Sequence, residues 1–156
     1  MTQLSEIYNQ RILELSANIA GAERLAEPDA TATAHSKLCG STVTVDLTLE
    51  GDRVMAYGQT VKACLLGQAA ASVMGRNIVG TEANELREVG SAMRKMLKEG
   101  GPPPTGRWAD LAVLQPVKDY KARHASTLLV FDAVESALAK AEAKQGVQPA
   151  TVQASA

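Results

Sequence analysis

Hydrophobic and polar residues alternate from Thr42 onward, which is the pattern of a strand with one buried face. The apolar positions in this stretch are Val43, Val45, Leu47 and Leu49. The alternation resumes at Val54, so the two runs predict a hairpin that turns between Glu50 and Arg53. A third strand is expected over Ala30 to Ala34, where small residues alternate.

Apolar residues at three- and four-residue steps predict helices on both sides of this hairpin. The first helix is expected to bury Leu4, Ile7, Tyr8, Ile12 and Leu15. After Cys64, an alanine-rich stretch predicts a second helix that ends at Gly75. Thr81 is expected to cap a third helix, which Gly100 and the prolines after it terminate.

Two more helices are expected toward the C-terminus. A short one covers Trp108 to Leu114, and the last one begins at about Ala125. Residues 145–156 contain few apolar positions and are expected to form a disordered tail. The pattern therefore predicts one α+β domain over residues 1–144, with a small three-stranded antiparallel sheet covered by helices.

Composition and charge narrow the functional classes. Hydrophobic residues make up 46% of the 156 residues and aromatic ones only 3%, so the core must consist mainly of aliphatic side chains. The net charge is −1 and no long run of Lys or Arg occurs, which argues against nucleic-acid binding. The sequence has neither a signal-peptide pattern nor an apolar stretch of about 20 residues, so we expect a cytoplasmic protein without membrane association.

The two cysteines are the main candidates for chemistry. A hairpin that turns at Gly51 and Asp52 brings Cys39 and Cys64 to the same end of the sheet. Cys64 at a helix start, with Lys62 nearby, is placed where a thiolate is favoured. The alternative is that both cysteines are small buried hydrophobic residues. Because no catalytic triad, phosphate-binding loop or carboxylate pair is present, we do not expect an enzyme.

Three blocks of the sequence resemble the IscU/NifU/SufU family of iron–sulfur cluster assembly scaffolds. Leu38 to Val45 resembles the Cys-Gly-Asp motif and the strand that follows it. Val61 to Met74 resembles the family's second cysteine block, and Arg123 to Leu128 resembles the run that carries the third cysteine. The long segment between the last two blocks, with its prolines after Gly101, is similar to the SufU branch.

The resemblance implies a site with a partly lost ligand set. Cys39 and Cys64 match the first two family cysteines, whereas Ser41 stands at the aspartate position and Ala125 at the third cysteine position. Alanine cannot ligate a metal, and serine is a weak ligand. His124 adjoins the third position and could replace the missing cysteine, since imidazole suits zinc and iron.

The resemblance leaves three functional hypotheses. In the first, the protein is an accessory or scaffold of cluster assembly that binds zinc, iron or an iron–sulfur cluster through Cys39, Cys64, His124 and, weakly, Ser41. The same thiols could instead accept sulfur from a cysteine desulfurase partner. In the second, the chain is a metal-free adaptor or regulator that binds a partner. In the third, its thiols are inert core groups.

Overall fold

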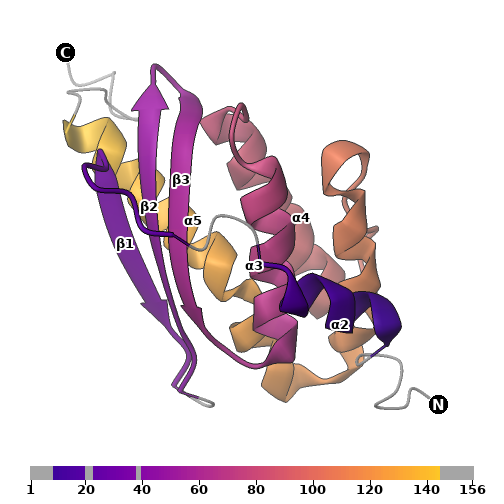
Figure 1. The fold of residues 1–156 in the computed structure, drawn as a ribbon. Helices are drawn as coiled ribbons and strands as arrows, with labels where there is room; N and C mark the ends of the chain where they lie inside the picture. Colours follow the sequence, from indigo (N-terminus) through magenta and orange to yellow (C-terminus); the bar gives the residue numbers. More distant parts are fainter. Residues whose placement is uncertain (1–8, 20–22, 38–39, 145–156) are drawn as a thin grey trace.

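The sheet has three antiparallel strands in the order β1-β2-β3, and helices pack against one of its faces (Figure 1). The computed structural model describes residues 9–19, 23–37 and 40–144. The strands are β1 (Ala30–His35), β2 (Thr42–Glu50) and β3 (Arg53–Lys62). The predicted α+β fold class, the predicted hairpin and the third strand are therefore confirmed.

Alternate side chains of β2 point to opposite faces of the sheet. Its core-facing side chains are all buried: Val43, Val45, Leu47 and Leu49. The hairpin register pairs Leu49 with Val54 and Glu50 with Arg53, so the turn is as short as the sequence predicts. At the other end of the hairpin, Thr42 lies opposite Lys62. Because the register is fixed by this buried face, the start of β2 and the end of β3 meet at one edge of the sheet.

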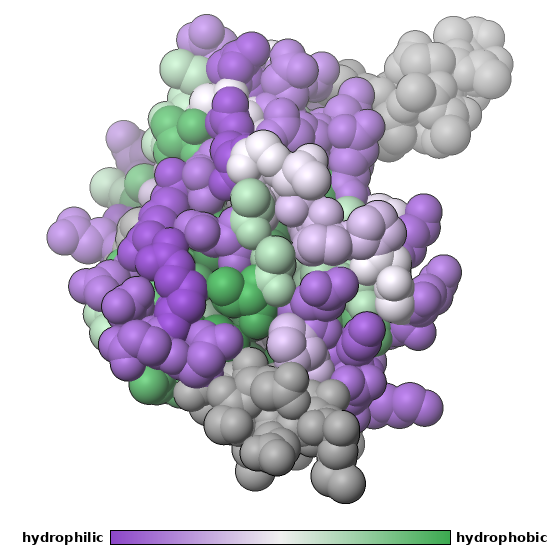
Figure 2. All heavy atoms as spheres, turned by 90° about the vertical axis from the view of Figure 1, so that its right-hand side faces the viewer, coloured by the Kyte–Doolittle hydropathy of each residue, from purple (hydrophilic) through white to green (hydrophobic). Residues whose placement is uncertain are grey.

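The helices form a layer on the core side of the sheet. Their bounds are α2 (Gln10–Ala17), α3 (Leu65–Asn77), α4 (Ala83–Glu99), η1 (Gly106–Asp119), η2 (Lys121–Arg123) and α5 (His124–Lys144). Helix α5 packs on β1 and β2, and α3 packs on β3 and α5. Figure 2 shows the outer side of this layer, where hydrophilic side chains surround hydrophobic ones near the middle of the face. None of the described helices is both long and apolar enough to span a bilayer.

Helix α3 is longer than the sequence pattern predicts. It continues through Gly75 to Asn77, so the expected end at Gly75 is wrong. The helix is covered by α2, α5 and η1, and burial of residues such as Val73 and Met74 outweighs the helix-breaking tendency of glycine. The Asn77 side chain donates to the Val73 carbonyl, which holds the last turn closed.

Two other predicted helix boundaries also change. Thr81 is not the cap of α4, because its hydroxyl donates to the Asn77 carbonyl and Glu82 occupies the capping position. The predicted short helix at Trp108 to Leu114 is a longer 3-10 helix, η1. Helix α5 begins at His124, which agrees with the predicted start at about Ala125. Leu4, Ile7 and Tyr8 of the first predicted helix and the predicted tail, 145–156, lie outside the described residues.

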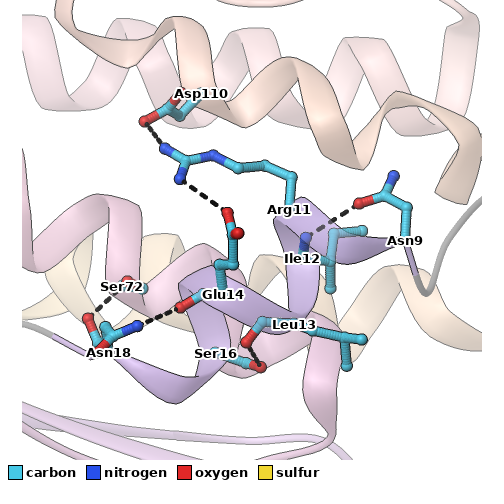
Figure 3. Close-up of polar contacts among 9 residues, drawn as sticks. All are labelled: Asn9, Arg11, Ile12, Leu13, Glu14, Ser16, Asn18, Ser72 and Asp110. Atoms are coloured by element: carbon cyan, nitrogen blue, oxygen red, sulfur yellow. Dashed lines mark hydrogen bonds and ion pairs between the residues drawn. The ribbon is translucent and has the colours of Figure 1, made fainter.

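Polar contacts fix α2 across the helix layer (Figure 3). The Asn9 side chain caps its first turn. Arg11 reaches η1, where its guanidinium lies 2.9 Å from the Asp110 carboxylate. The Ser72 hydroxyl of α3 donates to the Asn18 carbonyl over 3.2 Å. Helix α2 is thus tied to both neighbours near its two ends, while Ile12 and Leu15 are fully buried beneath it.

A buried carboxylate holds a chain segment on the outer face of the sheet. Asp46 on β2 is 0% exposed, although it points away from the helices. It accepts hydrogen bonds from the Arg24 guanidinium, the Leu25 amide at 3.0 Å and the Thr31 hydroxyl at 2.6 Å. Gly58, opposite Asp46, permits this approach, because a Cβ there would overlap the backbone of residues 23–25. The segment before β1 therefore covers the middle of the hairpin.

The hydrogen bonds of Asp46 determine its protonation. Burial by itself raises the pKa of this carboxyl, but the hydrogen bonds from Arg24, Thr31 and the Leu25 amide outweigh it, so the pKa is lowered. A lowered folded pKa stabilises the fold above the unfolded value of about 3.9. This contribution is lost as the pH falls through the lower folded value.

We expect Asp46→Asn to lower the free energy of unfolding by about 1–3 kcal/mol at neutral pH, because an amide removes the charge and leaves donors without an acceptor. The difference from the wild type should begin to narrow below about pH 4 and should close as the pH falls through the lowered folded pKa of Asp46, where the wild-type carboxylate is protonated too. Denaturant unfolding at both pH values measures it. Asp52→Asn in the exposed turn is the control and should change stability by no more than about 0.5 kcal/mol. Equal effects of the two variants would contradict the anchoring role of Asp46.

Candidate functional site

The candidate residues gather at the end of the sheet where β2 begins and β3 ends. Thr42 lies opposite Lys62, so Ser41 starts β2 at the same end at which Cys64 follows β3. Helix α5 also begins there, at the lower end of the molecule in Figure 1. Cys39 lies outside the described residues, and its expected proximity to Cys64 stays a prediction.

Cys64 occupies the capping position of α3 and is partly buried. Its sulfur lies 2.7 Å from the Ser126 hydroxyl oxygen, which belongs to the first turn of α5. Ser126 itself is 1% exposed. The contact joins two residues that are 62 positions apart and orients the Cys64 side chain toward α5.

Gly67 makes this contact possible by letting α3 and α5 approach closely. A Cβ at Gly67 would lie 3.0 Å from the Ser126 carbonyl oxygen and 2.8 Å from the Ala63 Cβ. Both distances are shorter than ordinary van der Waals contacts, so the glycine is needed for the spacing of the helices. Sequence reasoning did not identify Ser126. The glycine within the alanine-rich helix was the available signal, but it did not indicate which segment comes close.

His124 is the first residue of α5 and is buried. Its Nε2 lies 3.0 Å from the Val117 carbonyl and 3.1 Å from the Lys118 carbonyl. Carbonyl oxygens only accept, so Nε2 carries the proton and donates. In the neutral ring, Nδ1 is then the nitrogen with a free lone pair. A ring N–H bound to a backbone carbonyl is the usual arrangement around a metal-binding histidine.

The two positions at which the sequence departs from the family pattern differ in exposure. Ser41 is buried, and its carbonyl accepts from the Ser36 amide over 2.9 Å in the loop before β2. Ala125 is exposed between His124 and Ser126 in the first turn of α5. The position that the resemblance aligns with a third cysteine is thus exposed, but its methyl group cannot ligate a metal.

The described part of the site offers an incomplete ligand set. Within residues 9–19, 23–37 and 40–144, no group of three or more His, Cys, Asp or Glu side chains is placed to hold a metal ion. Cys64 and the Nδ1 atom of His124 are suitable donors, and Cys39 is the third candidate outside this range. The donor chemistry fits zinc or iron, since thiolate and imidazole are ligands that both metals accept.

Comparison with solved structures identifies close relatives of this fold. The chain is 56% identical to the N-terminal part of a nitrogen-fixing NifU-like protein from Brucella abortus, with a TM-score of 0.89 over 90% of this chain and 98% of that chain. A putative iron–sulfur cluster assembly scaffold protein for the SUF system from Fervidobacterium islandicum shares the fold, with 22% identity and a TM-score of 0.79 over 87% of this chain and 99% of that one. No protein-family model and no curated protein matches the chain.

We expect Ser126→Cys to form a disulfide with Cys64 under mild oxidation, because the new sulfur replaces an oxygen that lies 2.7 Å from the Cys64 sulfur. Peptide mapping under non-reducing conditions identifies the linked pair. Ser91→Cys, at an exposed position of α4, is the control and should leave Cys64 unlinked. A Ser126→Cys protein with an unlinked Cys64 after oxidation would show that the two side chains do not meet in solution.

Proposed function

This chain belongs to the IscU/NifU/SufU family, and on that premise we propose that it takes part in iron–sulfur cluster assembly as a scaffold-like or accessory protein. It acts as a carrier of metal or sulfur and not as an enzyme. The observation that carries the proposal is the meeting of Cys64 with the first turn of α5, which also holds His124. This arrangement brings a thiol and an imidazole to one end of the domain.

In the metal-binding form of the proposal, Cys39, Cys64 and Nδ1 of His124 hold zinc or iron. Bound zinc or iron would supply a Lewis acid to which sulfide or a partner's thiolate can be added. The carbonyls of Val117 and Lys118 fix the ring of His124, so this donor is oriented in advance. Ser41 is the weakest candidate, because its hydroxyl must lose a proton to ligate.

In the sulfur-accepting form, Cys64 receives sulfur from a cysteine desulfurase. The Cys64 thiolate attacks the outer sulfur of the desulfurase persulfide, a new S–S bond forms on Cys64, and the desulfurase cysteine leaves as a thiolate. No oxidant or reductant is consumed. The Ser126 hydroxyl lies next to the Cys64 sulfur and holds it in one orientation.

A second candidate function is a metal-free adaptor that binds a partner of the assembly pathway. The exposed methyl group of Ala125 favours this reading, because it stands where the family provides a thiolate. Measurements of metal content and of sulfur acceptance distinguish the adaptor function from the carrier function.

We expect the protein purified without chelator to bind zinc or iron in a near-stoichiometric amount, and this amount to fall strongly in Cys39→Ala, Cys64→Ala and His124→Gln. Glutamine at position 124 can still donate to the Val117 carbonyl, so its effect reports the ring nitrogen and not the loss of a structural hydrogen bond. Elemental analysis and zinc titration provide the measurement. His35→Gln is the control, because His35 is exposed on β1 and contacts Thr42 at 3.3 Å.

A gain-of-ligand variant sharpens this test. Ala125→Cys restores a thiol at an exposed position and should raise zinc affinity by at least about tenfold, because it adds a thiolate to the ligand set. A wild-type chain that stays metal-free after incubation with zinc would rule out the metal-binding form. The thiol carrier and the adaptor would then be the remaining functions.

We expect Cys64 to gain one sulfur atom when the protein is incubated with a cysteine desulfurase and free cysteine. Mass spectrometry of the alkylated peptide containing Cys64 measures this gain, and reduction with a thiol should remove it. The Cys39→Ala variant shows whether the first cysteine takes part. If neither cysteine gains sulfur and no metal is bound, the adaptor reading is supported in place of the carrier.

A further inference from the structure

Five cations stand around the site end of the domain, and we call them the basic rim: Lys37, Lys62, Lys118, Lys121 and Arg123. The four lysines are exposed and Arg123 is half-buried. All the ion pairs found among the described residues involve other groups, so no rim cation is neutralised by a carboxylate there. These cations give the site end a local positive charge on a chain whose net charge is −1.

Three of the rim cations are close to the candidate donors, either in the sequence or by contact. Lys62 ends β3 two residues before Cys64. Arg123 immediately precedes His124, and the Lys118 carbonyl accepts from the His124 ring over 3.1 Å. Lysines and an arginine from separate segments therefore share one end of the molecule with the thiol and the imidazole.

Negative charge is scarce at this end and present at the opposite one. In segments 35–37, 40–42, 60–66 and 117–127, Asp119 is the only acidic residue. The far end of the hairpin carries Glu50 and Asp52, with Glu82 beside Arg53. Strand β2, which is 9 residues long, separates the two ends by about 30 Å. The far end also carries cations, among them Arg53 and Lys140, so an excess of positive charge is found only at the site end.

We propose that the basic rim docks an acidic surface of the protein partner that exchanges sulfur or metal with Cys64. The identity of the exchanged group rests on the function proposed above. The rim cations come from the ends of β1 and β3 and from η1 and η2, so several segments contribute to one charged surface. A long polyanion such as a nucleic acid would extend beyond the rim over a domain whose net charge is −1. An acidic protein patch of limited size pairs with the rim alone and would be steered toward Cys64.

The first test compares two triple charge reversals that change the net charge equally. Lys62→Glu/Lys121→Glu/Arg123→Glu reverses the rim. Arg76→Glu/Lys140→Glu/Lys144→Glu is the control, because its three exposed positions lie near the C-terminal ends of α3 and α5, at least about 16 Å from the helix starts. Circular dichroism and thermal unfolding establish that both variants are folded.

The local potential at Cys64 is measured with two alkylating reagents in a Cys39→Ala background. Iodoacetate is an anion and iodoacetamide is neutral, and both react with the thiolate, so the ratio of their rates reports the potential and not the thiolate fraction. We expect the rim variant to lower this ratio about tenfold at low ionic strength, and added salt to remove the difference. The control variant should keep the wild-type ratio. Equal ratios in the two triple variants would overturn the proposal.

Docking itself is measured by titrating the protein into a fluorescent polyglutamate peptide. The wild type and the control variant should bind it in a salt-dependent manner, and the rim variant should bind at least about tenfold more weakly. An oligodeoxynucleotide of the same charge is the competing ligand. Tighter binding of the oligonucleotide, or no peptide binding despite a changed reagent ratio, would also overturn the proposal.

These assays require neither a bound metal nor a desulfurase. If the protein neither binds zinc nor accepts sulfur, but the rim variant still changes the alkylation ratio and peptide binding, only the proposed function is refuted. If the protein binds zinc and accepts sulfur, but the rim variant changes neither the alkylation ratio nor peptide binding, only the docking surface is refuted.

Discussion

The close packing of α3 against α5 at Gly67 is the constraint on which the site depends. Cys64 caps one helix and Ser126 lies in the first turn of the other, so any separation of the helices would part the sulfur from the hydroxyl. A Cβ at position 67 would force such a separation, because it would meet both Ser126 and Ala63. The absence of a side chain at Gly67 thus allows α3 and α5 to approach closely enough for Cys64 to contact Ser126.

The hairpin also fixes the position of the site, because both of its faces are covered. The core-facing residues of β2 pack on α5, and Asp46 ties residues 24 and 25 to the opposite face. A buried carboxylate is costly unless it is fully hydrogen-bonded, and Asp46 accepts from three residues. The strand ends that meet beside Cys64 therefore belong to a sheet whose register is fixed from two sides.

The sequence determines the regular parts of this fold more clearly than its contacts. The hairpin follows from strict alternation over β2, and the end of α4 follows from Gly100, which adopts a left-handed conformation. The end of α3 was mispredicted because local propensity at Gly75 is outweighed by tertiary packing. The contact between Cys64 and Ser126 could not be predicted. The two residues are 62 positions apart, and the periodicity of a helix does not indicate which other helix it packs against. The role of His124 was proposed from its neighbours in sequence, whereas its bonds to the Val117 and Lys118 carbonyls depend on how η1 ends.

The exposed Ala125 stands at the position that the family resemblance assigns to a third cysteine, and it would change the kind of metal site that this end of the domain could form. Closed structural zinc sites have four protein ligands, whereas sites that exchange a ligand have three and leave one position open. Cys39, Cys64 and His124 would supply three of these ligands. Such a site suits transient binding and transfer to a partner better than permanent storage. The unpaired cations around it are consistent with this conclusion, because transfer requires that the partner arrive in the correct orientation.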